Sequence, residues 1–411
     1  MMAVEAKPAA RRAIIVGGSL GGLFTALLLR RSGWEVEVHE RVTGDLSGRG
    51  AGIVTHPELF EVLARAGIAR SEAEVGVAVS GRRVFRADGT LLGERALPQV
   101  LTAWGHLHGL LHQALPAGAY RSGRSLVRVE EAEDAVTAHF ADGSTARGDL
   151  LVGADGIGST VRAHTLPEVA PLYAGYVAWR GLVDEADLTQ ETRAALCDHF
   201  SFSLPPGEQM LGYPVAGEGR GGRRFNFVWY RPAAAGTDLR ALLTDVDGLA
   251  QPLSIAPNRI RPEVIAGMRA DARRLLAPPF AEVVERTAQP FLQAIQDLEA
   301  PRMALGRRTV ILGDAAFVAR PHVGMGVTKA AADADALARA LEAHPHDLPA
   351  ALSQFEAARL AFGRAVVRRA RELGAYMQAQ ILTPHERALA ERHRAPEAVM
   401  AETAVATGLA A

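Results

Sequence analysis

The sequence predicts a two-domain α/β fold in which a parallel-sheet domain is interrupted by a sheet-rich domain and followed by C-terminal helices. A strand, a glycine turn, a helix and a second strand open the chain. Two more glycine turns follow buried apolar strands at 150–152 and 309–312. Aromatic or alternating runs at 173–180, 200–204, 209–213 and 224–230 are typical of strands in a separate sheet. Residues 328–392 are rich in Ala, Leu and Arg at helical spacing.

The first glycine turn, Gly17-Gly18-Ser19-Leu20-Gly21-Gly22, has the sequence context of a Rossmann-like dinucleotide fingerprint. Gly17 permits the tight turn, and Gly22 lets the helix pack closely on the strand. Ser19 replaces the second glycine of G-x-G-x-x-G, and its hydroxyl can donate to a phosphate. Glu40 ends the second strand 23 residues after Gly17, where a carboxylate can accept both ribose hydroxyls. The segment therefore predicts a dinucleotide at the positive end of a helix.

The other two glycine turns also follow strands. The second runs Gly153-Ala154-Asp155-Gly156-Ile157-Gly158-Ser159-Thr160-Val161-Arg162, and alone it indicates only a strand-to-helix turn with a capping Asp. The third is residues 313–326, which begin Gly313-Asp314 and end Gly324-Met325-Gly326. Asp314 can accept a hydrogen bond from a ribityl hydroxyl, and a helix from Gly326 can stabilise negative charge on a bound ring.

These three segments, in this order, resemble the aromatic-ring flavoprotein monooxygenases of the p-hydroxybenzoate hydroxylase type over roughly residues 12–380. The stretches 46–54, 173–181 and 226–230 are similar to the subgroup that hydroxylates 2,6-dihydroxypyridine, which also tolerates Ser at the third fingerprint position. The chain departs from the family pattern in having Phe317 for a frequent His, Thr328 for Asn and Trp104 for a FAD-contacting Arg.

The resemblance implies FAD as the bound cofactor and NADH or NADPH as the electron donor. It implies a discontinuous Rossmann-like FAD-binding domain at 11–75, 98–171 and 300–350, and a substrate domain at 76–97 and 172–299. C-terminal helices are expected at 351–392, with flexible ends at 1–10 and 393–411. Arg41 reads as a charge beside Glu40 rather than a 2′-phosphate site. The residues expected at the cofactor are Gly17, Gly18, Ser19, Leu20, Gly22, Glu40, Arg41, Asp155, Gly156, Arg162, Asp314, Pro321, Gly324, Met325 and Gly326.

The family chemistry implies that NAD(P)H reduces the flavin, which captures O₂ as a C(4a)-hydroperoxide and hydroxylates a hydroxypyridine or a phenol. A base that ionises the ring hydroxyl would help, and His322, beside Pro321, is the first candidate. Tyr213 is the second, as a contact to substrate polar groups. Alternatively, His322 is a histidine at the start of a helix that donates to a nearby carbonyl, and Tyr213 is a tyrosine that packs in the sheet. His199 and His106 are weaker candidates, and Arg180 is expected to make a structural ion pair.

Composition limits the partners of the chain. Net charge is -1 over 411 residues, so neither nucleic acid nor a membrane is expected as a partner. The single cysteine fits a reducing compartment and no run approaches about 18 apolar residues, so the predicted location is the cytoplasm. Cys197, the one cysteine, reads as a core side chain. No metal-ligand motif is present. The resemblance makes a homodimer plausible. A halogenase or reductase of this fold, or a flavin-binding module without turnover, remain as alternatives, although the W-x-W-x-I-P segment of halogenases is absent.

Overall fold

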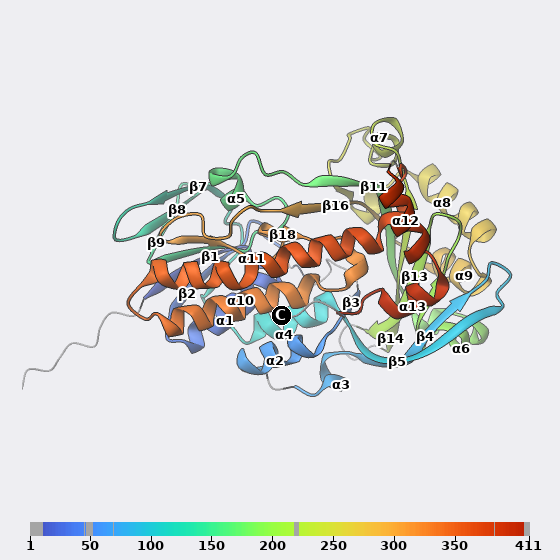
Figure 1. Cartoon of the computed structure of the whole chain (residues 1–411), viewed down its shortest axis with the longest axis horizontal. Coiled ribbons are helices and arrows are strands. Elements are labelled where there is room, and N and C mark those ends of the chain that lie inside the picture. The colour runs from blue at the N-terminus through green and yellow to red at the C-terminus, as the bar shows by residue number, and fades with distance from the viewer. Residues whose placement is uncertain are drawn as a thin grey trace, which may run out of the picture.

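The computed structural model describes residues 11–44, 46, 52–68, 70–217, 222–381 and 383–406. Most of the 46–54 stretch, namely residues 47–51, therefore lies outside the described residues. So do the expected flexible end 1–10 and the last part, 407–411, of the expected flexible end 393–411. Figure 1 shows the parallel-sheet elements in one half of the molecule and the larger sheet in the other.

The N-terminal domain is built on a five-stranded parallel sheet with the order β17-β10-β1-β2-β6. Its central strand is a run of buried Ala, Ile and Val side chains, as expected where both faces of a sheet are covered. All five strands end at one edge, so turns far apart in sequence meet there. The strands are β1 (Arg12–Val16), β2 (Glu35–His39), β6 (Tyr120–Arg121), β10 (Leu150–Gly153) and β17 (Thr309–Ile311).

Helices and a small antiparallel sheet enclose this parallel sheet. Helix α1 packs against the alanine-rich α10, whose small side chains permit a close approach, and α11 runs alongside α10 (Figure 1). The three-stranded sheet β7-β8-β9 packs nearby. These elements are α1 (Leu20–Arg31), α2 (Pro57–Arg65), α3 (Glu72–Val75), α4 (Trp104–Gln113), α5 (Thr160–Thr165), α10 (Gly326–Ala343), α11 (Leu348–Leu373), β7 (Leu126–Glu131), β8 (Val136–Phe140) and β9 (Thr145–Gly148).

The second domain is formed by a large mixed sheet with the order β15-β16-β11-β14-β13-β12-β4-β5-β3, with β18 pairing β16. Its strands are β3 (Gly52–Val54), β4 (Val77–Phe85), β5 (Leu91–Ala103), β11 (Leu172–Asp184), β12 (His199–Ser203), β13 (Gln209–Ala216), β14 (Arg223–Pro232), β15 (Ser254–Ile255), β16 (Phe291–Glu299) and β18 (Phe317–Val318). Its helices are α6 (Gln190–Leu196), α7 (Thr237–Leu242), α8 (Pro262–Leu275) and α9 (Pro278–Arg286).

The boundaries of this sheet differ from the expected limits of 76–97 and 172–299. Strand β5 runs through the expected boundary at 97/98 and pairs β3, so residues 52–54 and 98–103 belong to the large sheet. Residues 87–90 connect β4 to β5, and the antiparallel pairing of the two strands runs from Val77 to Phe85 with register shifts between Val79 and Gly81 and between Val84 and Phe85.

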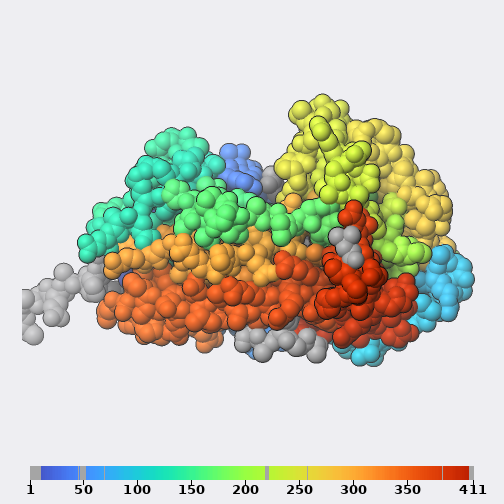
Figure 2. Space-filling view, turned by 45° about the horizontal axis from the view of Figure 1, so that its top comes forward, coloured from blue at the N-terminus to red at the C-terminus, as the bar shows by residue number. Residues whose placement is uncertain are grey.

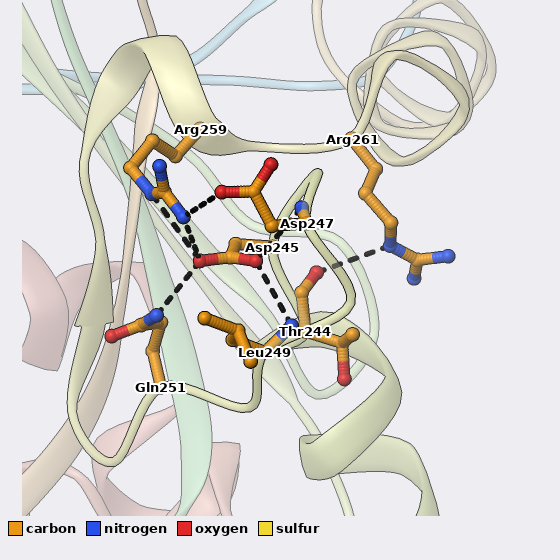
Figure 3. A network of polar contacts seen from close by, with 7 residues as sticks. All are labelled: Thr244, Asp245, Asp247, Leu249, Gln251, Arg259 and Arg261. Carbon is orange, nitrogen blue, oxygen red and sulfur yellow. Dashed lines mark hydrogen bonds and ion pairs between the residues drawn. The ribbon is translucent and has the colours of Figure 1, made fainter.

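A polar network stiffens the loop that joins α7 to α8. The Asp245 carboxylate accepts hydrogen bonds from the backbone of Leu249, from Gln251 and from the Arg259 guanidinium, 2.7 Å away (Figure 3). Arg261 donates to the Thr244 carbonyl in the same loop. Because both ends of the loop are tied to one carboxylate, β15 is held against β16 at the edge of the sheet.

The C-terminal segment is ordered further than the sequence suggests. The expected flexible stretch 393–411 is wrong for 396–402, which form α13 (Pro396–Glu402) after α12 (Pro384–His393). The physical reason is burial of Val399 and Met400, and the buried Arg82 guanidinium, which donates to the Met400 carbonyl at 3.0 Å. Figure 2 shows the orange and red C-terminal helices as a continuous surface along one side of the molecule. Among the described helices, none has the length and apolar composition to cross a membrane.

Candidate functional site

A cavity of about 440 Å³ lies where the parallel strands end. We call it the glycine-turn cavity, because all three predicted glycine turns contribute to its wall. The turn after β1, the turn after β10 and the turn after β17 meet there, as parallel pairing of these strands requires. Its wall includes Gly17, Ser19, Leu20, Glu40, Arg41, Trp104, Asp155, Gly156, Asp314 and Gly326.

Two glycines of the first turn are dictated by close backbone contacts. Gly17 has φ of 108°, which favours glycine, and a Cβ there would overlap the Ala154 carbonyl. A Cβ on Gly22 would overlap the carbonyl oxygen of Gly17. These contacts bring the start of α1 against β1 and leave its first N–H groups, which have no intrahelical partner, facing the cavity.

Ser19 and Glu40 are the polar side chains near this turn. Ser19 is the N-cap of α1, yet its side chain makes no capping hydrogen bond, so the hydroxyl remains available to a ligand. Glu40 is buried, and its carboxylate accepts the backbone N–H groups of Gly18 at 2.8 Å and Val42 at 2.9 Å. A carboxylate has about four acceptor positions, so about two remain for a ligand.

The second turn is held by its own side chains. Asp155 accepts hydrogen bonds from Ser159 Oγ and from the Thr160 backbone, and it therefore caps α5. Burial raises the pKa of the Asp155 carboxyl. Arg162 does not line either cavity described here: its guanidinium donates to the carbonyls of Ile157 and Ala315, 2.6 and 2.9 Å away. Arg162 thus ties the second turn to the third rather than reaching a ligand.

A cluster of charges, buried at Lys329 and Asp333 and open at Asp314, supports the third turn. Asp314 faces the cavity, and the Lys329 Nζ lies 3.8 Å behind it and 3.9 Å from Asp333. Asp333 accepts the Gly313 N–H at 3.0 Å and the Arg359 Nε at 2.7 Å. Desolvation raises the pKa of the Asp314 carboxyl, and the Lys329 charge opposes that rise. The cluster fixes the turn and directs one carboxylate into the cavity.

A second cavity of about 260 Å³, the inter-domain cavity, opens where the parallel-sheet domain meets the large sheet. It shares Asp314, Gly326 and Val327 with the glycine-turn cavity, so the two cavities adjoin at the N-terminus of α10. Its other wall residues include Gly52, Val54, Arg180, Tyr213, Val228, Tyr230, Gln293, Gln296, Arg320, Pro321, Gly324, Thr403 and Ala404.

His322 does not line the inter-domain cavity. Only 1% of its surface is exposed, and its Nε2 lies 2.8 Å from the Tyr176 hydroxyl. Burial lowers the pKa of His322 to about 3, with the charges of Arg320 and Arg180 adding to the effect. The expectation that His322 faces the substrate is wrong in geometry, because Tyr176 and Tyr230 pack against its ring. The alternative prediction, that His322 bonds a backbone carbonyl, names a different partner from the one found, which is the Tyr176 hydroxyl.

Several polar groups on the wall have no hydrogen-bond partner within the part of the chain that the structure describes. Among them are the Tyr213 hydroxyl, the Tyr230 hydroxyl and the Arg180 guanidinium, whose Nε is buried. Burial raises the pKa of both tyrosines, that of Tyr230 to about 12, so both hydroxyls are donors at neutral pH. The predicted structural ion pair of Arg180 is therefore not found among the described residues.

The remaining predicted residues lie at several distances from the cavities. Arg41 is exposed at the rim of the glycine-turn cavity. Met325 is buried and caps α10 without lining either cavity. His199 bonds Ser80, and His106 bonds the Glu74 carbonyl, so neither faces the inter-domain cavity. Cys197 is buried, and burial raises the pKa of its thiol to about 12.

The residues present fit FAD. The backbone around the glycine-turn cavity leaves no room for a Cβ at Gly17, and the cavity wall carries Glu40 after β2 and Asp314 after β17 as acceptors for hydroxyl groups. Ser19 and the first turn of α1 can hold a pyrophosphate between them. The ring end would reach Gly326, at the N-terminus of the 18-residue helix α10, and would there face the inter-domain cavity.

Known proteins agree with this geometry. The chain is 32% identical over 372 residues to 2,6-dihydroxypyridine 3-monooxygenase of Paenarthrobacter nicotinovorans, covering 90% of this chain and 92% of the relative. The chain belongs to the FAD-dependent aromatic-ring monooxygenases. A family model described as FAD binding domain-like also matches residues 173–297. The resemblance stated from sequence is thereby confirmed, and with it FAD as the cofactor.

Two solved structures are similar to this chain over more than nine tenths of its length. The structure of 2,6-dihydroxypyridine-3-hydroxylase from Arthrobacter nicotinovorans gives a TM-score of 0.85 at 32% identity, covering 93% of this chain and 97% of that one. Klebsiella pneumoniae HpxO, complexed with FAD and uric acid, gives 0.75 at 25% identity, covering 96% and 93%. The predicted fold class, a Rossmann-like domain with a sheet-rich domain and C-terminal helices, is confirmed.

Sequence reasoning missed several parts of the site. Thr403 and Ala404 line the inter-domain cavity although they lie in the segment expected to fray. The Ala404 N–H donates to the His322 carbonyl at 2.7 Å, a contact between distant segments that carries no local signal. Lys329 and Asp333 do carry one, since opposite charges four residues apart in a helix face each other.

Proposed function

We propose that this monooxygenase uses NADH or NADPH and O₂ to hydroxylate a hydroxylated aromatic ring, a hydroxypyridine or a phenol, bound in the inter-domain cavity. The net reaction consumes one ring C–H, one O₂, one NAD(P)H and one proton, and it yields the ring hydroxyl, NAD(P)⁺ and water. The observation that carries the proposal is that the two cavities adjoin, with Asp314 and Gly326 in the walls of both. When bound, reduced FAD supplies an electrophilic oxygen from O₂.

The residues of the chain perform the other tasks. The first turn of α1 and Ser19 bind the pyrophosphate, and Glu40 binds the adenosine ribose. The N-terminus of α10 stabilises negative charge near the ring end. Val54, Val228 and Leu211 give the inter-domain cavity apolar walls, which exclude water around the reacting atoms. Tyr213 donates a hydrogen bond that orients the ring hydroxyl.

Substrate-stimulated consumption of NADH and NADPH, measured against hydroxypyridines and phenols, tests this function. The FAD-loaded protein should consume one of the two donors at least about tenfold faster with the right ring, and the product should gain one oxygen from ¹⁸O₂. Peroxide release should fall as hydroxylation rises. Stimulated consumption that yields only peroxide with every ring, or no stimulation at all, would contradict the proposal.

Replacement of Tyr213 by Phe sharpens the test. Tyr213→Phe keeps the ring in the wall but removes the donor, so hydroxylation should fall about 10-fold while FAD is retained. Tyr173→Phe is the matched control, because the Tyr173 hydroxyl bonds the Ala233 carbonyl at 2.9 Å and does not line the cavity. Equal hydroxylation by the two variants would remove Tyr213 from the site. Light scattering would test the homodimer, which we propose from family likeness alone.

A further inference from the structure

We propose that the inter-domain cavity binds its aromatic ligand as an anion and that Arg180 recognises the anionic oxygen. The inference deepens the proposed function, because it names the charge state of the ring that the cavity selects. It begins from an imbalance: two arginines line the cavity, and only one of them is neutralised within the described residues.

Arg320 is the neutralised arginine. Its Nε donates to Asp297 at 2.8 Å, and one terminal nitrogen donates to the Gln378 side chain at 2.8 Å. Arg371 also donates to Asp297, so this carboxylate is shared between two cations behind the cavity wall. Arg320 is therefore a cation whose charge is met by a carboxylate of the protein.

Arg180 has no such partner among the described residues. It lies on β11 directly opposite Val228 of β14, and both side chains line the cavity. Its Nε is buried without a hydrogen bond. A half-buried guanidinium without a counter-charge is unfavourable, and an anionic ligand with acceptor oxygens would supply what is missing.

The groups around Arg180 favour the same ligand. Tyr213 and Tyr230 add two neutral hydroxyl donors to the wall. The Arg180 charge is near enough to both to oppose the rise in their pKa that burial causes. The acidic residue on the described wall is Asp314, which lies at the cofactor end beside the Lys329 ammonium. The large-sheet side of the cavity thus offers one cation and several donors, and an oxyanion accepts from all of them.

Binding the ring as an anion would also favour its hydroxylation. No histidine lines the described part of the cavity, so the wall lacks the residue that most often removes a proton at neutral pH. A ring that enters already ionised needs no such base, and its negative charge makes the ring carbons more nucleophilic. Arg180 selects that ionised ring by binding its oxygen. The anionic oxygen can be a deprotonated ring hydroxyl or a ring carboxylate, and the test separates these sources.

Binding to the oxidised, FAD-loaded protein is measured by calorimetry with two matched pairs of probes. One pair is 2,6-dihydroxypyridine, at a pH where it is ionised in solution, and neutral 2,6-dimethoxypyridine. The other pair is 6-hydroxynicotinate and 6-hydroxynicotinamide. Wild type is compared with Arg180→Gln and Arg180→Lys. Arg86→Gln is the control, since Arg86 is an exposed arginine of the same domain that bonds only Thr90 in the described chain.

We expect Arg180→Gln to weaken binding of one or both anions by about 10- to 100-fold, with the neutral probes changed by less than about threefold. Loss confined to the first pair would identify a ring oxyanion, and loss confined to the second a carboxylate. Arg86→Gln should match wild type. Unchanged anion binding by Arg180→Gln, or equal losses for anionic and neutral probes, would overturn the proposal.

Arg180→Lys keeps the charge without the planar fork, and it decides the matter if Arg180→Gln does not fold. Anion binding about 3- to 10-fold weaker than wild type supports the proposal, and unchanged binding overturns it. FAD content is measured on every variant, and its loss in Arg180→Lys would assign the guanidinium to the cofactor and overturn the proposal. Binding is measured without turnover, so this test is independent of the proposed function. Arg180-dependent anion binding without hydroxylation would support this inference and contradict the proposed function. Hydroxylation with anion binding that does not depend on Arg180 would do the reverse.

Discussion

The two cavities differ in how their polar side chains are satisfied. In the glycine-turn cavity, Glu40 and Asp155 each accept backbone hydrogen bonds that fix their orientation. In the inter-domain cavity, Arg180, Tyr213 and Tyr230 face the space without partners among the described residues. The first cavity is pre-organised for one constant ligand, whereas the second leaves its donors for a ligand to satisfy. That difference explains why a family can keep its cofactor and vary its substrate.

The largest expected effect is the loss of stability when Arg320, the neutralised arginine of the inter-domain cavity, loses its carboxylate partner. Asp297→Ala would leave Arg320 and Arg371 without their shared carboxylate, which is 2% exposed. Loss of one partner from a buried pair should lower the free energy of unfolding by about 3–5 kcal/mol, measured by denaturant titration. Asp134→Ala, which removes an exposed pair with Arg147, should change it by less than about 1 kcal/mol. Equal effects would mean that the Asp297 network is not structural.

The glycine-turn cavity is tested by two glycine substitutions. Gly22→Ala places a methyl on the Gly17 carbonyl, so FAD affinity should fall about 100-fold, or about 3 kcal/mol. Gly109→Ala in α4 is the control, because its methyl would meet no atom within 4 Å and Gly109 does not line the cavity. Flavin absorbance per protein after purification reports both. Full flavin in Gly22→Ala would show that the close packing of α1 on β1 is not needed.

His322 should affect stability in acid rather than proton transfer to substrate. Its pKa is about 3 when folded and about 6.5 when unfolded, so the unfolded chain binds more protons between these values. Stability from His322 is therefore present above about pH 6.5 and is lost at about 1.4 kcal/mol per pH unit as the pH falls below it. His322→Gln should flatten the dependence of unfolding free energy on pH between 6 and 4. An unchanged slope would show that the histidine is not buried in neutral form.

The smallest effect is expected for Arg180. Because the guanidinium has no counter-charge in the described chain, Arg180→Gln should change the free energy of unfolding by less than about 1 kcal/mol, in either direction. The contrast with Asp297→Ala separates a cation kept for structure from one kept for a ligand. Destabilisation comparable to that of Asp297→Ala, in the same denaturant titration, would assign Arg180 a structural role.

The fold and the glycine-turn cavity could be predicted because their signals are local. Gly17, Gly22 and Glu40 sit at fixed spacings around one strand and one helix, and parallel pairing brings Asp314 to the same edge. The inter-domain cavity could not be predicted in detail, because its neighbours come from distant segments. Arg180 reads in sequence as a pairing residue, and His322 reads as a base. The role of Arg180 depends on the lack of a counter-charge among the described residues, and that of His322 depends on its contact with Tyr176.

The most direct measurement is a crystal structure of the FAD-loaded protein with 2,6-dihydroxypyridine or 6-hydroxynicotinate bound. The flavin should lie at Asp314 and Gly326, with the ring of the ligand in the inter-domain cavity. An anionic oxygen of the ligand should lie within about 3 Å of the Arg180 guanidinium and near the Tyr213 hydroxyl. A ligand that binds elsewhere, or an Arg180 paired with a protein carboxylate or with the flavin, would contradict the distinction between the two cavities.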